Sequence, residues 1–207
     1  MLDKWSIHLV KPVLKKTAGS LNKLGLSANQ ITGIGFFIGM MAVPALWKQY
    51  YLLALGFIVL NRIFDGLDGE LARLRGTSDA GGYLDITLDF IFYSAVIWGF
   101  ALANPEVNAL ASATLIFSFI GTGSSFLAFA IIAAKLNIEQ LNCSRKSFYY
   151  LGGLTEGTET IVVLILFCVF PESFPLLAYI FSGMCWITVV FRVIAGYATI
   201  KQVETTK

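Results

Sequence analysis

The residues of this sequence best suited to chemistry are four aspartates inside two apolar segments. Asp65 and Asp68 are three residues apart, and Asp85 and Asp89 are four apart. Each spacing places both members of a pair on one face of a helix. A short polar stretch separates the pairs, so we expect two antiparallel neighbouring helices whose four carboxylates meet at one depth. A group of oxygen ligands of this size suits Mg²⁺, Mn²⁺ or Ca²⁺ and not zinc.

The position of these acids along the helices also indicates a bound cation. Arg73 and Arg75 stand at the polar end of the first segment, and Asp65 precedes them by eight to ten residues, or roughly 12–15 Å at about 1.5 Å per residue. A charged aspartate in membrane hydrocarbon costs about 2.5–3.5 kcal/mol, and neighbouring like charges oppose each other's ionisation. A divalent ion removes both costs, so the sequence predicts a metal site here.

Glycines and arginines around the acids suit a phosphate ligand. Glycine lets a ligand approach the backbone closely, and arginine supplies positive charge at the mouth of the site. Metal and arginine beside a water-filled notch are a recurring arrangement for phosphoryl transfer. The residues concerned are Gly66, Gly69, Gly81, Gly82, Arg73 and Arg75.

The elements that must position these residues are membrane helices. The 207 residues are 57% hydrophobic and 14% charged, with a mean hydropathy of +0.73, whereas soluble domains are about 45–50% apolar and roughly 25% charged. The composition predicts an all-α polytopic membrane protein with six transmembrane helices in one domain, residues 26–202. The expected spans are residues 31–47, 51–74, 83–103, 107–134, 155–171 and 175–200.

Residues 1–25 form a separate juxtamembrane segment in this interpretation. Its basic and apolar residues recur at helical spacing on neighbouring faces, which is typical of an amphipathic helix lying at the membrane interface. The basic face holds Lys4, His8, Lys11 and Lys15, and the apolar face holds Leu2, Trp5, Leu9 and Val13. We expect no cleavable signal peptide, because Lys4, Lys11 and Pro12 interrupt the first apolar stretch.

The distribution of lysine and arginine predicts the orientation. Twelve of these residues fall on one side of the proposed spans and only Lys48 falls on the other, with Arg62 and Arg192 inside spans. By the positive-inside rule, both termini and the loops 75–82 and 135–153 are cytoplasmic. The absence of a dense basic run argues against nucleic-acid binding. Cys143, Cys168 and Cys185 lack metal-ligand spacing and are interpreted as packing residues.

The acidic motif resembles that of the CDP-alcohol phosphatidyltransferases. That family has DxxDGxxAR, about eight residues, and then GxxxDxxxD, and this chain has seven residues between Arg73 and Gly81. It also lacks the proline that often precedes the asparagine equivalent to Asn29. The stretches LNRxxDGLDGxLAR and GLTEGTET are similar to a bacterial inner-membrane branch of the family. The matching residues are Asp65, Asp68, Gly69, Ala72, Arg73, Gly81, Asp85 and Asp89.

The resemblance implies a function for nearly the whole chain. The four aspartates would hold two Mg²⁺ or Mn²⁺ ions, and Asp89 would also be the general base for the acceptor hydroxyl. Gly69, Arg73 and Ser78 would contact the CDP moiety. The protein would be a multi-pass enzyme of the bacterial inner membrane, with a tendency of the family to form homodimers. It would transfer a phosphatidyl or other phosphoalcohol group from a CDP-alcohol such as CDP-diacylglycerol to a small alcohol, with release of CMP.

Three other interpretations of the acids remain open at this point. The aspartates could cap helices and pair with Arg62, Arg73 and Arg75. They could mark an ion path in a transporter, although such acids would be spread across the membrane. The chain could also be a catalytically silent membrane scaffold of the same fold, although a scaffold predicts the loss of at least one aspartate.

The residues that would select the acceptor favour acceptors of different charge. Glu156 and Glu159 are three apart and together favour a cationic or neutral alcohol, while Arg192 favours an anionic one. Alternatively, the two glutamates only occupy a first helical turn, where the helix dipole favours acids. Gly121 and Ser125, four apart, indicate close helix packing, either in a dimer interface or within the chain.

Overall fold

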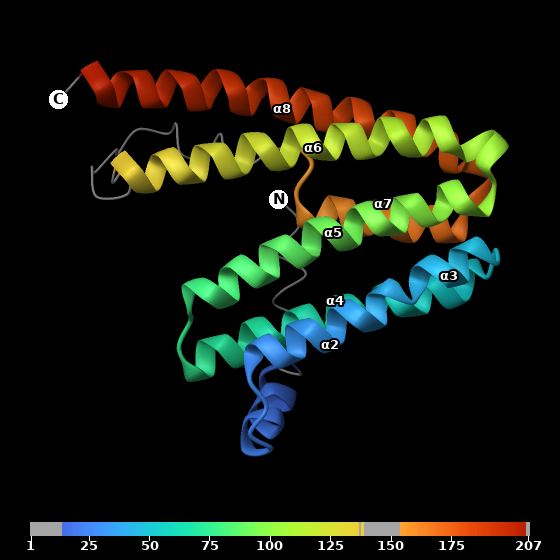
Figure 1. Ribbon diagram of the computed structural model, residues 1–207, viewed down its shortest axis with the longest axis horizontal. Helices are drawn as coiled ribbons and strands as arrows, with labels where there is room; N and C mark the ends of the chain where they lie inside the picture. Colours follow the sequence, from blue (N-terminus) through green and yellow to red (C-terminus); the bar gives the residue numbers. More distant parts are fainter. Residues whose placement is uncertain (1–13, 137, 139–153, 206–207) are drawn as a thin grey trace.

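The structure is a computed structural model that describes residues 14–136, 138 and 154–205 (Figure 1). Over these residues it contains helices and no strand, which confirms the all-α prediction. A first helical stretch covers residues 14–23. The elements that follow are α2 (Ala28–Met40), α3 (Ala42–Trp47), α4 (Tyr51–Arg75), α5 (Asp79–Ala103), α6 (Pro105–Leu136), α7 (Gly157–Val169), the 3₁₀ turn η2 (Pro171–Ser173) and α8 (Phe174–Thr205).

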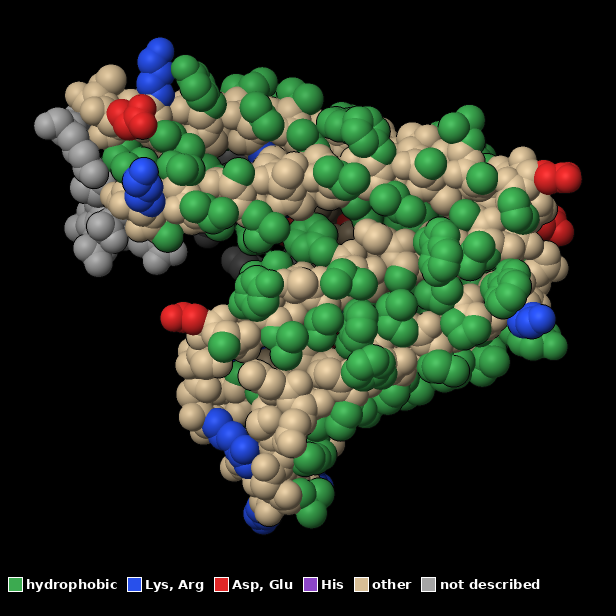
Figure 2. Space-filling view, in the orientation of Figure 1, with side chains coloured by type: hydrophobic (Ala, Val, Ile, Leu, Met, Phe, Trp, Pro, Cys, Tyr) green, Lys and Arg blue, Asp and Glu red, His purple; other side chains and the backbone are tan. Residues whose placement is uncertain are grey.

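The helices lie in layers that meet at one end of the molecule and separate at the other. In Figure 1, α6 and α8 lie side by side as one arm, α2 and α4 form the other, and α5 and α7 lie between them. The α4–α5 connection and the ends of α6 and α8 share the open end. Figure 2 shows the molecule hollowed between the arms on that side.

Aromatic packing holds the closed end together. The ring of Phe100 (α5) stacks on that of Phe174 (α8), with centroids 4.6 Å apart, and Phe167 (α7) meets both edge-on. All three side chains are fully buried. The side-chain amide of Gln49 also donates to the carbonyl of Ala103 at 2.8 Å. The closed end therefore anchors α5, α7 and α8, while the four aspartates lie in the halves of α4 and α5 nearer the α4–α5 connection.

The first predicted span is broken into two helices. Alpha-helical hydrogen bonding stops at Met40 and resumes at Ala42, with Pro44 in the first turn of α3. Proline has no backbone N–H and cannot continue the helix through this point. At the other end of α2, Ser27 and Gln30 form a reciprocal capping box, which determines where the helix begins.

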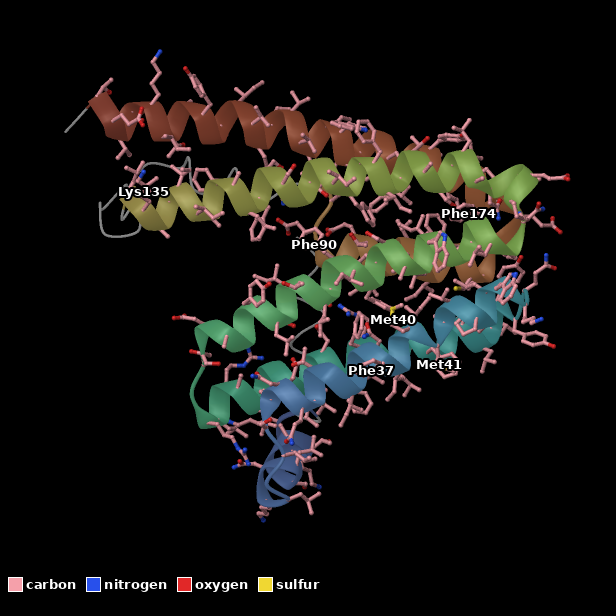
Figure 3. All side chains as sticks on the ribbon, in the orientation of Figure 1. Phe37, Met40, Met41, Phe90, Lys135 and Phe174 are labelled. Atoms are coloured by element: carbon pink, nitrogen blue, oxygen red, sulfur yellow. The ribbon has the colours of Figure 1, made fainter. Side chains whose placement is uncertain are left out.

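The membrane character of the chain is visible on its surface. Large apolar side chains cover the outer faces of the helices (Figure 2), and examples are Phe37, Leu52 and Leu110, each more than 70% exposed. Figure 3 shows Phe37 on the outside of α2. Four helical units of the described chain are long and apolar enough to cross a membrane: Ala28–Trp47, Asp79–Ala103, Pro105–Leu136 and Pro171–Thr205.

Two of the six predicted spans do not qualify in the same way. Helix α4 has 25 residues but carries the acids and arginines of the motif, and α7 has only 13 residues, or about 20 Å at 1.5 Å per residue. A typical hydrocarbon core is about 30 Å thick. The six helical segments exist at the predicted positions, and the count of six membrane crossings stays a prediction.

The described part of residues 1–25, which the sequence predicts to be a juxtamembrane segment, is a helix packed on α4. Its apolar side, with Leu14, Ala18 and Leu21, contacts the buried residues Leu67 and Leu71. Lys15, Lys16 and Lys23 are exposed on the other side. Residues 1–13, which carry most of the predicted basic and apolar faces, lie outside the described residues.

Small residues allow α6 to pack within the chain. A Cβ on Gly121 would lie 3.1 Å from Val189 of α8, and one on Gly123 would lie 2.9 Å from Phe90 of α5. Figure 3 shows Phe90 between α5 and α6. Gly121 and Gly123 therefore pack against neighbouring helices of the same chain. Cys168 and Cys185 are free and buried, as expected for packing residues, and Cys143 lies outside the described residues.

Candidate active site

Three of the four predicted metal ligands come together between α4 and α5. One carboxylate oxygen each from Asp65, Asp68 and Asp85 lies within 4.8 Å of the other two. Asp68 is only 6% exposed, and its Oδ2 is buried without a hydrogen-bond partner among the described residues. Burying an unpaired carboxylate oxygen is costly, and a cation is the partner that this group of oxygens fits. These three residues therefore suit a divalent ion.

The fourth aspartate makes different contacts. Asp89 accepts two hydrogen bonds from Arg62, from Nη2 to Oδ1 at 2.7 Å and from Nη1 to Oδ2 at 3.3 Å. Tyr93 donates to the same Oδ2 at 3.1 Å. Arg62 also lies 3.6 Å from Oδ2 of Asp65. The structure thus separates Asp89 from the group of three, and the alternative that the acids pair with Arg62 holds for Asp89 and in part for Asp65.

Sequence reasoning missed the residues that surround Arg62. Asn61 accepts from the guanidinium and donates from Nδ2 to the carbonyl of Gly35 at 2.9 Å. Tyr93 follows Asp89 by four residues, so it lies one helical turn further along the same face of α5. An asparagine and an arginine side by side in an apolar run were the signal that could have indicated this network.

The predicted nucleotide-binding residues line one cavity of about 230 Å³ beside the acids. Gly69 and Arg73 come from the end of α4, and Ser78 comes from the start of α5. Asn29, at the start of α2, also lines it. Two of the acids, Asp68 and Asp85, complete the wall. The structure thus brings the three predicted residues to one place beside the carboxylate group.

Local contacts of these residues shape the cavity. Ser78 caps α5 by accepting a hydrogen bond from the N–H of Gly81 at 3.1 Å. A Cβ on Gly81 would lie 3.0 Å from Ser78 Oγ and 3.1 Å from Asn29 Oδ1. Glycine at this position therefore lets α2 and α5 approach each other at the cavity wall. Arg73 extends from α4 and contacts Glu70 at 2.7 Å, with its side chain 62% exposed.

One of the four glycines has a structural role instead. A Cβ on Gly66 would lie 2.9 Å from Cδ1 of Leu14, so this glycine faces the helix of residues 14–23 and not a ligand. The prediction that Gly66 opens space for phosphate is wrong for this reason. Gly69, Gly81 and Gly82 do line the cavity.

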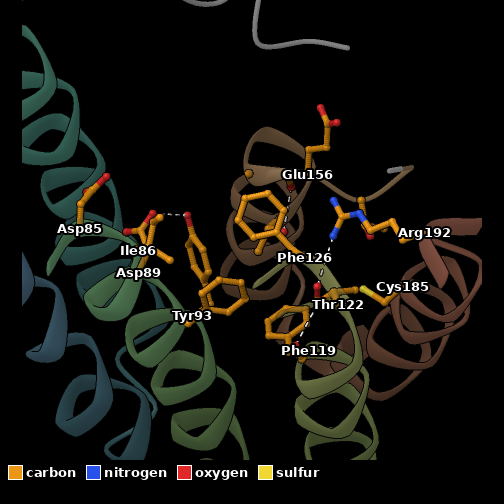
Figure 4. Close-up of a pocket in the computed structure, with 14 residues that line it drawn as sticks. Asp85, Ile86, Asp89, Tyr93, Phe119, Thr122, Phe126, Glu156, Cys185 and Arg192 are labelled. Atoms are coloured by element: carbon orange, nitrogen blue, oxygen red, sulfur yellow. Dashed lines mark hydrogen bonds between the residues drawn. The ribbon is translucent and has the colours of Figure 1, made fainter. Parts of the chain in front are cut away.

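A second, larger cavity of about 490 Å³ lies on the other side of α5. Asp85, Asp89 and Tyr93 line one wall, and residues of α6, α7 and α8 line the others (Figure 4). Arg192 of α8 enters it from the opposite side, where its Nη1 donates to the carbonyl of Thr122 at 3.3 Å and its guanidinium lies 5.7 Å from the centre of the Phe126 ring.

The two glutamates at the start of α7 are engaged in capping the helix. The Glu156 side chain accepts from the backbone N–H of Glu159, and the Glu159 side chain accepts from the backbone N–H of Glu156. Of the two, Glu156 lines the larger cavity and Glu159 does not. This geometry favours the first-turn interpretation of the acids over paired recognition of a cationic acceptor.

Asp85 belongs to the walls of both cavities. It also lines the narrow space between α2, α4 and α5 that holds Asp65 and Asp68. A cation bound by the three carboxylates would therefore face one ligand in the 230 Å³ cavity and another in the 490 Å³ cavity. This arrangement can bring a phosphate ester and a second reactant to opposite sides of one charged centre.

Comparison with known proteins agrees with these features. The inner membrane protein YnjF of Escherichia coli (strain K12) is 53% identical, over 99% of both chains. The archaetidylinositol phosphate synthase of Pyrococcus horikoshii is 29% identical, over 89% of this chain and 90% of the relative.

Solved structures share the fold. The phosphatidylinositol phosphate synthase PgsA1 of Mycobacterium tuberculosis, in complex with manganese and citrate, matches with a TM-score of 0.64 and 22% identity over 89% of this chain and 88% of that chain. Its structure with CDP-DAG bound gives 0.59 and 21%, over 93% and 94%. The sequence profile described as CDP-alcohol phosphatidyltransferase matches residues 26–194. The chain belongs to the CDP-alcohol phosphatidyltransferase family.

Proposed function

We propose that the protein transfers a phosphoalcohol group from a CDP-alcohol to a small alcohol and releases CMP, as a step of phospholipid synthesis. The observation that carries the proposal is the position of Asp85 in the walls of both cavities. The donor would place its nucleotide in the 230 Å³ cavity and its pyrophosphate at the carboxylates. The acceptor would enter the 490 Å³ cavity and reach the same phosphate from the other side.

The chain's own residues would divide the work as follows. Gly69, Arg73 and Ser78 would hold the CDP moiety. Asp65, Asp68 and Asp85 would hold Mg²⁺ or Mn²⁺, which when bound neutralises charge on the pyrophosphate and on the departing CMP. A bound metal ion and a bound CDP-alcohol agree with the likeness of the fold to a synthase that was solved with manganese and with CDP-DAG.

The reaction joins the acceptor oxygen to the phosphorus that carries the donor's alcohol group. The bond from that phosphorus to the oxygen shared with CMP breaks, and CMP keeps the electron pair. The proton of the acceptor hydroxyl passes to Asp89, which lines the acceptor cavity. A carboxylate offers about four lone-pair positions, and Arg62 and Tyr93 occupy three on Asp89. Its Oδ1 keeps one position for the acceptor hydroxyl.

One residue of the second cavity favours an acceptor with an anionic group: Arg192 is the single basic side chain among the described residues of a lining that also contains Asp85, Asp89 and Glu156. Arg192 directs its guanidinium into the cavity, whereas the glutamates are used in the cap of α7. An arginine in the acceptor cavity can bind a phosphate or carboxylate group of the acceptor molecule that also carries the reacting hydroxyl. We therefore propose a phosphorylated alcohol or a hydroxy acid as acceptor and CDP-diacylglycerol as donor.

The setting of the reaction is also proposed. The enzyme would span the bacterial inner membrane six times, with residues 1–25 as a juxtamembrane segment, residues 26–202 as the catalytic domain and both termini cytoplasmic. It would act as a homodimer. A transporter would need acids along the depth of its spans, whereas the four aspartates lie together between α4 and α5. A silent scaffold would lack one of them, and all four are present.

The test is CMP release by purified protein with CDP-diacylglycerol, Mg²⁺ or Mn²⁺, and a panel of alcohols. The panel contains anionic, zwitterionic, neutral and cationic members. We expect metal-dependent release with one anionic alcohol and its loss in Asp85→Asn. Release with cationic alcohols alone would overturn the acceptor assignment. No release with any CDP-alcohol and any acceptor, from protein that remains folded, would favour the scaffold.

A further inference from the structure

Arg62 is an arginine whose charge is held inside the site. Its side chain is 11% exposed, and its guanidinium lies 5.1 Å from the ring centres of both Phe92 and Tyr93. Cationic side chains are stabilised over aromatic faces, so the two rings hold the positive charge in place beside Asp89.

All five donors of the guanidinium are accounted for. Nε and Nη2 donate to Asn61 Oδ1, Nη2 also donates to Asp89 Oδ1, and Nη1 donates to Asp89 Oδ2 and to the hydroxyl of Tyr93 at 2.8 Å. An arginine has five N–H donors in a planar fork. Because Asn61 is itself bonded to the backbone of α2, the guanidinium is positioned by three helices.

This arginine pairs unequally with the four carboxylates, because it bonds to both oxygens of Asp89 but only lies 3.6 Å from one oxygen of Asp65. Asp65, Asp68 and Asp85 present their oxygens to one another, and the buried Oδ2 of Asp68 has no hydrogen-bond partner in the part of the chain that the structure describes. Asp89 instead shares both oxygens with Arg62. A divalent ion bound through Asp89 would have to lie next to the guanidinium, and two cations at such a distance repel each other.

We propose that Arg62 stays paired with Asp89 and neutralises its charge. As a result, the site binds one divalent ion at Asp65, Asp68 and Asp85 and admits a second only when Arg62 is displaced. The inference rests on the metal binding of the proposed function and not on the transfer reaction. Arg62 acts here as a positioning residue. It sets how many ions the four carboxylates hold before nucleotide binds.

The experiment counts Mn²⁺ ions per chain in the purified full-length protein without nucleotide. Electron paramagnetic resonance of free Mn²⁺ gives the number and affinity of bound ions, and the spectrum of the bound ions shows whether two of them are coupled. Wild type should bind one ion tightly. Arg62→Gln should bind a second at least tenfold more tightly than wild type does and should show a coupled pair. Arg62→Lys, which keeps the charge, should stay at one.

Two further variants separate the outcomes. Arg75→Gln removes the same charge from α4 at a residue that contacts Asn22 and not the acids, so it should bind as wild type does. Asp89→Asn should keep the single ion at an affinity within twofold of wild type. This variant tests the inference even if Arg62→Gln does not fold. Asp85→Asn should lose the single ion.

The results that overturn the inference differ from those that overturn the proposed function. Two equally tight ions in wild type, or a marked loss of the first ion in Asp89→Asn, would show that Asp89 is an ordinary ligand and that Arg62 does not set the count. No bound Mn²⁺ in folded wild type would contradict the metal site itself, and the proposed function with it.

Discussion

Leu14 fits against Gly66: a Cβ on this glycine would lie 2.9 Å from Cδ1 of the leucine. The contact joins the helix of residues 14–23 to α4 between Asp65 and Asp68. A residue that sequence reasoning assigned to phosphate binding therefore contributes to packing, one residue away from a metal-ligand candidate.

We predict that Gly66→Ala lowers the free energy of unfolding only when Leu14 is present. Overpacking costs about 1–3 kcal/mol, and we expect about 1 kcal/mol because the leucine's terminal methyl can move. In the Leu14→Ala background the same change should be neutral or stabilising, because alanine favours a helix by about 1 kcal/mol over glycine. Unfolding of the four proteins in detergent measures the coupling, and additive effects would show that the contact is absent.

Removing one ligand of the three-carboxylate group should abolish activity. Asp68→Asn should lower metal-dependent CMP release at least about 100-fold. Even the loss of a residue that only hydrogen-bonds to a metal ligand lowers metal affinity or activity about 10–100-fold. Asp79→Asn is the matched control, because Asp79 lies exposed in the first turn of α5 and lines none of the three cavities described above. Equal losses in both variants would mean that folding, and not metal binding, was disturbed.

The nucleotide cavity should be sensitive to a single methyl group. Gly81→Ala places a Cβ 3.0–3.1 Å from Ser78 and Asn29, so these neighbours must move. We expect a severalfold rise in KM for the CDP-alcohol with a smaller change in kcat. Gly56→Ala is the control for replacing a helical glycine by alanine, because a Cβ on Gly56 meets nothing within 4 Å. A rise in the acceptor KM alone would contradict the assignment of this cavity to the nucleotide.

Arg192 should act on the acceptor and not on the donor. A hydrogen bond to a charged group contributes about 1.5–3 kcal/mol, so Arg192→Leu should raise the KM of an anionic acceptor by about 10- to 100-fold. The KM for the CDP-alcohol should hardly change, and Arg192→Lys should restore part of the acceptor affinity. If steady-state kinetics show the donor KM rising instead, the 490 Å³ cavity belongs to the donor.

The ends of the molecule provide a test of orientation. Lys48 lies at one end of the helices, and Lys135 and Thr205 lie at the other (Figures 1 and 3). In a Cys143→Ser background, a membrane-impermeant maleimide should label Lys48→Cys in intact cells whose outer membrane has been made permeable. It should label Thr205→Cys only in inverted vesicles. The opposite pattern would reverse the predicted topology, and labelling of both on one side would contradict six crossings.

The sequence by itself determined the helices and the pairing of the acids. The spacing of Asp65 with Asp68, and of Asp85 with Asp89, depends only on the period of a helix. The short polar connection between the pairs was enough to predict that α4 and α5 run side by side. The sequence also predicted that Arg73, Arg75 and Lys135 lie at one common end of the helices, because spans and turns alternate along the chain. These features are local, or need only adjacent elements.

Only the tertiary structure decided which groups each acid meets. Periodicity places Asp89 on the same helix face as Asp85, but the position of Arg62 across the α4–α5 contact determines that Asp89 bonds to an arginine. The same holds for Gly66, whose neighbour Leu14 is distant in sequence. It holds too for Asp85, which is shared by two cavities because α5 lies between the arms. Such contacts depend on how helices pack and rotate against one another, which a pattern along one helix does not specify.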